Sequence, residues 1–170
     1  MRLAASHERP VLMPPRARIV PVASTMAGSM LAILPMIADA PVLPPFGLLM
    51  LLGWRLLRPE IWQAWVAIAL GAFDDLFSGQ PFGSAIALWT GTLIVLDMMD
   101  NRTMWRDYWL EWLVAGVAII TCMVGGWAAV AFTTGGGTVP GLVPQIAITI
   151  LCFPFALRVC ATLDRWRLRR

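Results

Sequence analysis

Long runs of uncharged, mostly apolar residues alternate with short polar segments along the chain. The first run, residues 19–38, has twenty uncharged residues. As an α-helix rising about 1.5 Å per residue, it is long enough to cross a hydrocarbon core of about 30 Å. Two shorter runs follow at 42–54 and 61–73, and Pro59 predicts a tight turn between them. A fourth run covers residues 76–96.

The next uncharged stretch, residues 112–157, is too long to be one span. Its 46 residues would form a helix of roughly 70 Å, more than twice the thickness of the hydrocarbon core. The glycine-rich segment 133–138 marks the reversal between a fifth and a sixth run. The pattern therefore predicts an all-α membrane protein, a six-span helical bundle with short second and third arms.

The composition agrees with a membrane protein. The chain is 59% apolar and 14% charged, whereas soluble domains average about 45–50% and about 25%. All thirteen basic residues are arginines, and they cluster at the ends of apolar runs, which argues against a nucleic-acid-binding protein. The three cysteines lie inside apolar runs, with no disulfide or metal spacing. The one histidine, His7, lies in the amino-terminal tail, so no histidine triad or zinc site is expected.

The arginines also predict the topology. Four lie before residue 19, two in the 2–3 turn, two in the 4–5 loop and five at the carboxyl end, while the three alternate loops hold none. Because basic residues favour the cytoplasmic side, both termini are expected there and the loop after the third arm is expected outside. The domains are then a basic tail (1–18), a transmembrane domain (19–161) and a second basic tail (162–170).

The stretch 70–89 is the one place where acids and a turn interrupt apolar sequence with no basic residue nearby. Asp74 and Asp75 end one apolar arm, and Gly79 and Pro81 supply the backbone freedom and the fixed φ typical of a turn. Such acids are most often solvated. One of them can instead accept hydrogen bonds from the turn amides. Catalysis is disfavoured, because adjacent helical residues point about 100° apart.

Two other charges lie at the cytoplasmic edge of short arms, Arg55 and Asp97. They can pair across the bundle or extend separately to the interface. The sequence contains no phosphate loop, nucleophile elbow or cofactor fingerprint. We therefore expect a protein that is not an enzyme and that has no cofactor or metal.

The order of these features resembles the bacterial rod-shape-determining MreD family. An apolar arm with a prolyl entry, LPPFGLLMLLGW, precedes Pro59, and the hairpin GAFDDLFSGQPFG follows. The hairpin is similar to the family pattern G-x-x-x-D-hydrophobic-x-S-G-x-x-x-G. The matching positions are Gly71, Asp75, Ser78, Gly79 and Gly83. The ending CFPFALRV is similar too, so the resemblance spans roughly residues 40–165. Asp74 is an extra acid at a place that is usually apolar in the family.

The resemblance implies a non-enzymatic scaffold of the cell-elongation complex in the bacterial inner membrane, acting in rod shape and peptidoglycan synthesis. Its implied partners are MreC, RodA with its transpeptidase and, indirectly, MreB. The resemblance also selects Asp75 as the acid that the fold needs. We expect its carboxylate to accept hydrogen bonds from the amides of residues 78–80, while Asp74 faces water or a partner.

The family fold is also similar to the substrate-binding subunits of energy-coupling-factor vitamin transporters, which supplies an alternative function. In that case the short second and third arms would frame a pocket for a small molecule. Such a pocket needs several converging polar side chains. The spans offer only five, which favours the scaffold: Thr90, Thr92, Thr121, Gln145 and Thr149.

Overall fold

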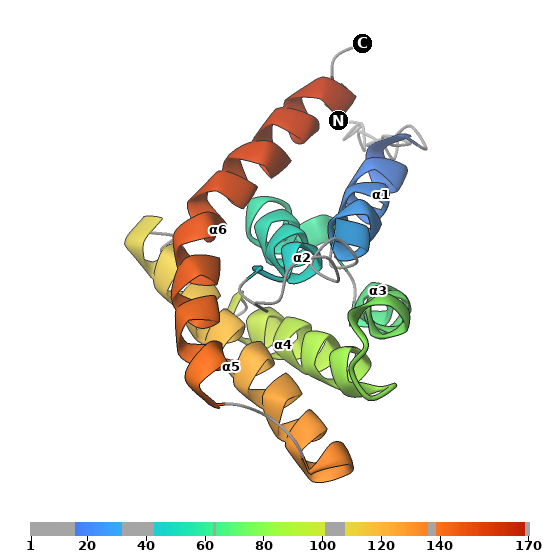
Figure 1. Ribbon diagram of the computed structural model, residues 1–170. Helices are drawn as coiled ribbons and strands as arrows, with labels where there is room; N and C mark the ends of the chain where they lie inside the picture. Colours follow the sequence, from blue (N-terminus) through green and yellow to red (C-terminus); the bar gives the residue numbers. More distant parts are fainter. Residues whose placement is uncertain (1–15, 32–42, 63, 101–107, 136–138, 169–170) are drawn as a thin grey trace, which may run out of the picture.

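The computed structural model describes residues 16–31, 43–62, 64–100, 108–135 and 139–168, and these are all-α, as predicted (Figure 1). In chain order the elements are α1 (Arg16–Met30), α2 (Phe46–Leu57), the 3-10 helix η2 (Pro59–Ile61), α3 (Ala64–Ser78), α4 (Ser84–Asp100), α5 (Tyr108–Thr134) and α6 (Val139–Leu168).

The centre of the molecule is α2, which packs against α1, α5 and α6 and lies between α1 and α6 in Figure 1. Its sequence, FGLLMLLGWRLL, is rich in leucine and has no β-branched residue, a composition that favours helix. All nine residues from Gly47 to Arg55 are buried. The Arg58 amide donates to the Trp54 carbonyl at 2.8 Å, and Pro59 then ends the helix. With 12 residues, α2 is only about 18 Å long.

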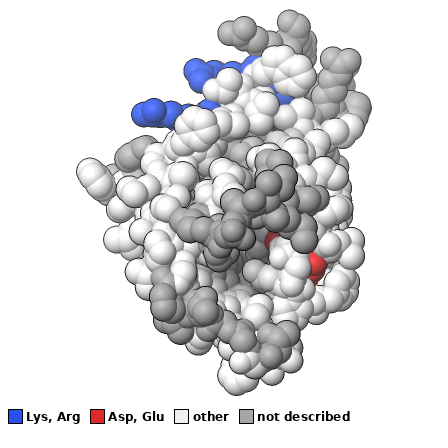
Figure 2. Space-filling view, in the orientation of Figure 1, with Lys and Arg blue, Asp and Glu red and all other residues white. Residues whose placement is uncertain are grey.

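Contacts between distant helices define two opposite ends of the molecule. At one end, which we call the basic end, the carboxyl-terminal turns of α2, α4 and α6 meet. There Arg55 forms an ion pair with Asp97, and Arg58 lies 3.1 Å from the Asp164 carboxylate. The start of α1 and the end of α6 lie together in Figure 1. Figure 2 shows basic side chains gathered there, while the described surface below them is almost uncharged.

The other end, which we call the hairpin end, contains residues 79–83 between α3 and α4. Gly47 at the start of α2 lies against Ser29 at the end of α1 and Asp74 near the end of α3. The Gln145 side chain near the start of α6 donates to the Leu43 carbonyl at 2.9 Å. Successive helices therefore run in alternating directions between the two ends.

Among the described residues, two helices are long and apolar enough to cross a membrane, namely Trp109–Thr133 and Gly141–Leu168. Only 33% and 22% of their most apolar windows are buried. Their outward side chains include Trp109, which is 77% exposed, and Phe132, which is 91% exposed. Such helices leave a broad apolar surface, unlike the enclosed core helix of a soluble protein.

Several helix ends differ from the boundaries expected from the sequence. The fourth run was expected to end at residue 96, but α4 continues to Asp100, where two acids bind Arg55. The tail expected at 162–170 is helical to Leu168. Asp164 there pairs with Arg167 one turn later, which stabilises the last turn. Figure 1 shows that α6 changes direction along its length, as its internal Pro144 and Pro154 predict.

Candidate functional site

Asp75, in the last full turn of α3, holds the start of α4 in place. Its carboxylate accepts hydrogen bonds from the backbone amides of Gly83 at 2.8 Å, Ala85 at 2.9 Å and Ile86 at 3.4 Å. The Ser84 hydroxyl donates a fourth, at 3.1 Å. The first amides of a helix have no partner within the helix, and they favour negative charge. Asp75 is therefore a helix cap supplied by the preceding helix.

The donors to Asp75 differ from those expected. The sequence suggested the amides of residues 78–80, but the hydrogen bonds come from residues 83–86. The reason is that α3 stays helical to Ser78. Asp75 then faces across the hairpin toward α4, and the turn between the two helices lies beyond it. The expected Ser78 is half-buried, and its hydroxyl has no hydrogen-bond partner among the described residues.

The remaining hairpin residues shape the backbone. Gly79 and Gly83 have φ of 67° and 100°, a region that side chains disfavour. The Pro81 carbonyl accepts the Ser84 amide at 3.1 Å, closing the turn. A Cβ on Gly71 would lie 2.8 Å from the Ile86 backbone, so this glycine allows α3 and α4 to approach closely. The hairpin residues singled out from the sequence therefore lie together in one α3–α4 unit.

Asp74 points into the molecule, contrary to the expectation that it faces water or a partner. A Cβ on Gly47 would lie 3.0 Å from the Asp74 carboxylate and 2.2 Å from the Ser29 hydroxyl. Three helices thus meet at a point where only a hydrogen atom fits. The expectation was wrong because the residue preceding Asp75 on α3 turns toward α1 and α2 rather than away from the bundle.

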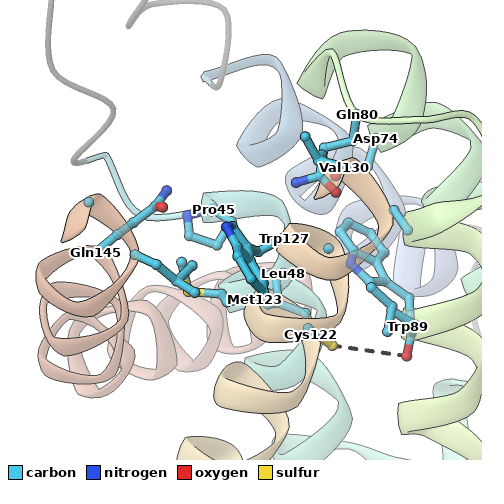
Figure 3. A pocket seen from close by; sticks show the side chains of 15 residues that line it. Pro45, Leu48, Asp74, Gln80, Trp89, Cys122, Met123, Trp127, Val130 and Gln145 are labelled. Atoms are coloured by element: carbon cyan, nitrogen blue, oxygen red, sulfur yellow. Dashed lines mark hydrogen bonds between the residues drawn. The ribbon is translucent and has the colours of Figure 1, made fainter. Parts of the chain in front are cut away.

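Asp74 also lines a cavity of about 350 Å³ at the hairpin end. Small-molecule sites commonly have about 300–1,000 Å³. Figure 3 shows Asp74 and Gln80 at one end of the cavity and Gln145 at the other, with Trp127 and Leu48 between them. The lining comes from five helices and the hairpin, and comprises Pro45, Leu48, Asp74, Gln80, Ala85, Leu88, Trp89, Cys122, Met123, Gly126, Trp127, Val130, Gly141, Leu142 and Gln145.

The polar atoms of the cavity are held by specific contacts. The Gln80 side chain lies against α5. Its Oε1 atom is 2.9 Å from the position that a Cβ on Gly126 would take. Gln145 is fixed by its hydrogen bond to the Leu43 carbonyl. The indole N–H of Trp127 is buried and has no hydrogen-bond partner in the described part of the chain. The cavity therefore presents an acid and two carboxamides.

The sequence pointed to a different set of polar residues. Of the five span residues considered for a pocket, Gln145 lines this cavity, while Thr92 and Thr121 line another of about 410 Å³ between α4 and α5. Thr92 contacts the Cys122 sulfur at 3.3 Å, and Thr149 donates to the Gln145 carbonyl at 2.6 Å. Asp74 and Gln80 were missed as pocket residues because they lie at a helix end and in a turn, where polar residues are expected on other grounds.

At the basic end the structure joins Arg55 and Asp97, the first of the two arrangements left open by the sequence. Asp100, which the sequence did not suggest, lies 2.9 Å from the same guanidinium group. Arg55 is 3% exposed, so both acids compensate a buried charge.

A second cluster surrounds Asp164 on α6. Its carboxylate lies 3.1 Å from Arg58 and 2.6 Å from Arg167. The Arg167 guanidinium also lies 5.2 Å from the ring centroid of Trp54, within cation–π range. The Arg55 cluster connects the carboxyl-terminal turn of α4 to that of α2, and the Asp164 cluster connects the carboxyl-terminal turn of α6 to that of α2.

The described residues contain no group of three or more His, Cys, Asp or Glu side chains placed to hold a metal ion. Comparisons with protein-family models, with curated proteins and with solved structures give no match for this chain.

Proposed function

We propose that this chain is a multi-pass membrane scaffold of the MreD type, acting in bacterial cell elongation through MreC and the RodA synthase pair. The observation that carries the proposal is the α3–α4 hairpin. Four of the five matched positions have a structural role: Asp75 is the helix cap, Gly71 the close-approach glycine, and Gly79 and Gly83 the positive-φ residues. The hydroxyl of the fifth, Ser78, has no hydrogen-bond partner among the described residues. A motif whose members act as one physical unit supports the resemblance better than isolated identities do.

A membrane location is supported by the outer surface of α5 and α6. These helices are long, uncharged over most of their length and exposed on their apolar faces. Leu151 and Phe155, one turn apart on α6, are 72% and 69% exposed. The hydrocarbon of a lipid bilayer would cover such apolar side chains, which need no polar partner. We therefore infer that the six helices lie in the inner membrane, with the shorter ones enclosed by or tilted against the longer ones.

The proposed topology places the basic end in the cytoplasm and the hairpin end outside. The alternation of helix direction supports it, because the arginines of α2 and α6 then share one side. A reporter that fluoresces only in the periplasm should stay dark when fused after Arg170 and should fluoresce when inserted at Gly79. A fluorescent carboxyl-terminal fusion would contradict the topology.

The scaffold function is tested by isolating the tagged full chain from mild detergent extracts of the source membranes. MreC and RodA should co-purify with it and should be identified by mass spectrometry. An unrelated six-span protein carrying the same tag is the control for non-specific capture. Recovery of the folded chain without MreC would contradict the proposal.

The cavity supports a second candidate, a small-molecule-binding membrane subunit of the vitamin-transporter type. Its volume and converging polar groups fit a bound solute. A defined small molecule should then accompany the purified protein and be detected by mass spectrometry after denaturation. The candidate is rejected if the purified protein carries no such molecule and none of a panel of vitamins raises its thermal stability.

A further inference from the structure

We propose that the cavity at the hairpin end binds a small organic cation, an ammonium group carried on an apolar body. This inference goes beyond the scaffold function, and it names a ligand class for the second candidate, on whose site it rests. It is carried by the charge, the aromatic walls and the shape of the cavity.

The described residues of the lining offer a site for negative charge and none for positive charge. Asp74 is the one acid among them. The sequence has no basic residue at 19–54, 59–101 or 107–157, the stretches that supply every lining residue. The nearest arginine clusters bind acids at the basic end. An anionic ligand would therefore find no counter-charge, whereas an ammonium group would compensate a partly enclosed carboxylate.

Asp74 and Asp75 differ in what surrounds their charge. The Asp75 carboxylate accepts four hydrogen bonds, three of them from backbone amides. Asp74 has Ser29 and Gly47 on one side and the cavity on the other. Asp75 is thus committed to the fold, while Asp74 can bind a ligand in the cavity. This difference explains why an extra acid stands beside the structural one.

The walls of the cavity suit an apolar cation. The indoles of Trp89 and Trp127 both line it. Their rings offer apolar contact area for the body of such a ligand. Met123 and Leu48 add apolar surface near Trp127, and Gln145 lies at the end opposite Asp74 (Figure 3). The ammonium group would lie at Asp74 and Gln80, with the apolar body between the indoles.

The test uses three ligands of one shape and different charge. Phenethylamine, 2-phenylethanol and 3-phenylpropionate are titrated into the detergent-purified full chain, with heat of binding as the readout. Phenethylamine should bind at least about tenfold more tightly than the alcohol, and the acid should bind weakest. Equal affinities, tighter binding of the acid or no binding of phenethylamine would overturn the proposal. This comparison needs no variant, so it does not depend on whether a variant folds.

A matched pair of variants locates the site. Asp74→Asn should weaken phenethylamine by at least about tenfold and leave 2-phenylethanol unchanged, since the amide keeps the shape and removes the charge. Glu60→Gln, in the exposed η2 turn, should leave both affinities unchanged. Loss of phenethylamine binding in Glu60→Gln alone, or unchanged binding in Asp74→Asn, would overturn the assignment to the cavity.

An ammonium group can come from a soluble amine or from an ethanolamine lipid headgroup. Titrations in nanodiscs of phosphatidylglycerol, with and without phosphatidylethanolamine, distinguish these sources. A lower phenethylamine affinity in the presence of phosphatidylethanolamine assigns the site to the headgroup, and an unchanged affinity assigns it to a soluble amine.

The results also separate this proposal from the functions proposed above. Recovery of MreC is scored independently of ligand binding. A co-purified ligand that is neutral or anionic, with no preference for phenethylamine, would retain the small-molecule function and reject the cation.

Discussion

The two ends of the molecule stabilise buried charge in different ways. At the basic end, Arg55 is enclosed and two acids from α4 compensate it. At the hairpin end, Asp75 is 5% exposed and lies in a stretch with no basic residue. Its charge is stabilised by backbone amides at the start of α4 instead. One end therefore depends on side chains distant in sequence, and the other depends on local backbone geometry.

This difference has a consequence for tolerance to mutation. When a buried charge is compensated by charged side chains, the whole ion pair can be replaced by apolar residues of similar volume, often with no loss of stability. A charge held by amides has no such compensation, since the amides cannot be removed. The hairpin end should therefore be the more sensitive to single substitutions.

The largest effect is expected for Asp75→Leu. It leaves three amides and a hydroxyl without their acceptor, and should lower the free energy of unfolding by about 3–4 kcal/mol. Thermal unfolding of the detergent-purified protein measures the loss. Asp75→Asn should cost less, because its carbonyl oxygen can still accept two of these four bonds, and Asp74→Leu is the adjacent control. A larger loss for Asp74→Leu than for Asp75→Leu would contradict the comparison.

A smaller effect is expected at the basic end from the double variant Asp97→Asn, Asp100→Asn. It leaves the buried Arg55 guanidinium without a counter-charge and should cost about 2 kcal/mol, less than full burial would imply because both acids are partly exposed. Adding Arg55→Met should recover most of the loss. If the triple variant is less stable than the double variant, the unpaired charge of Arg55 is not the main cause of the loss.

The smallest effect is expected from a glycine pair. Gly71→Ala forces a Cβ against the Ile86 backbone at 2.8 Å and should cost about 1–2 kcal/mol. Gly91→Ala on α4 meets no atom within 4 Å, so it should be neutral or stabilising by up to about 1 kcal/mol. Chemical denaturation of both variants checks the sign. Equal losses would show that close approach of α3 and α4 is unimportant.

The sequence predicted the features that depend on neighbouring residues. The turn at Pro59 and the hairpin follow from short-range patterns of apolar residues, glycine and proline, whereas the choice of Asp75 over Asp74 comes from the resemblance to a family hairpin. The donors to Asp75 were wrongly placed, because the sequence does not show that α3 continues to Ser78. Helix ends are set by such tertiary contacts as much as by the residues themselves.

Of the contacts across long sequence separations, the sequence suggested only the pairing of Arg55 with Asp97, as one of two alternatives. Arg58 and Asp164 are 106 residues apart, and no local pattern links them. The cavity was missed for a related reason. Its lining combines single residues from separate elements, and Asp74 alone has an unremarkable position beside Asp75. Only the packing of α3 against Ser29 of α1 and Gly47 of α2 turns it inward.

The enclosure of α2 bears on the order in which the protein assembles. Gly53 of α2 lies against Cys160 of α6, with 2.9 Å between its Cβ position and the sulfur. A ribosome adding about 5–20 residues per second synthesises this part of α6 roughly 5–20 seconds after α2. During that interval the face of α2 that contacts α6 has no native partner. The packing of α2 is therefore completed only when α6 has been synthesised. A chain stalled before α6 would leave that face of α2 accessible to chaperones and proteases.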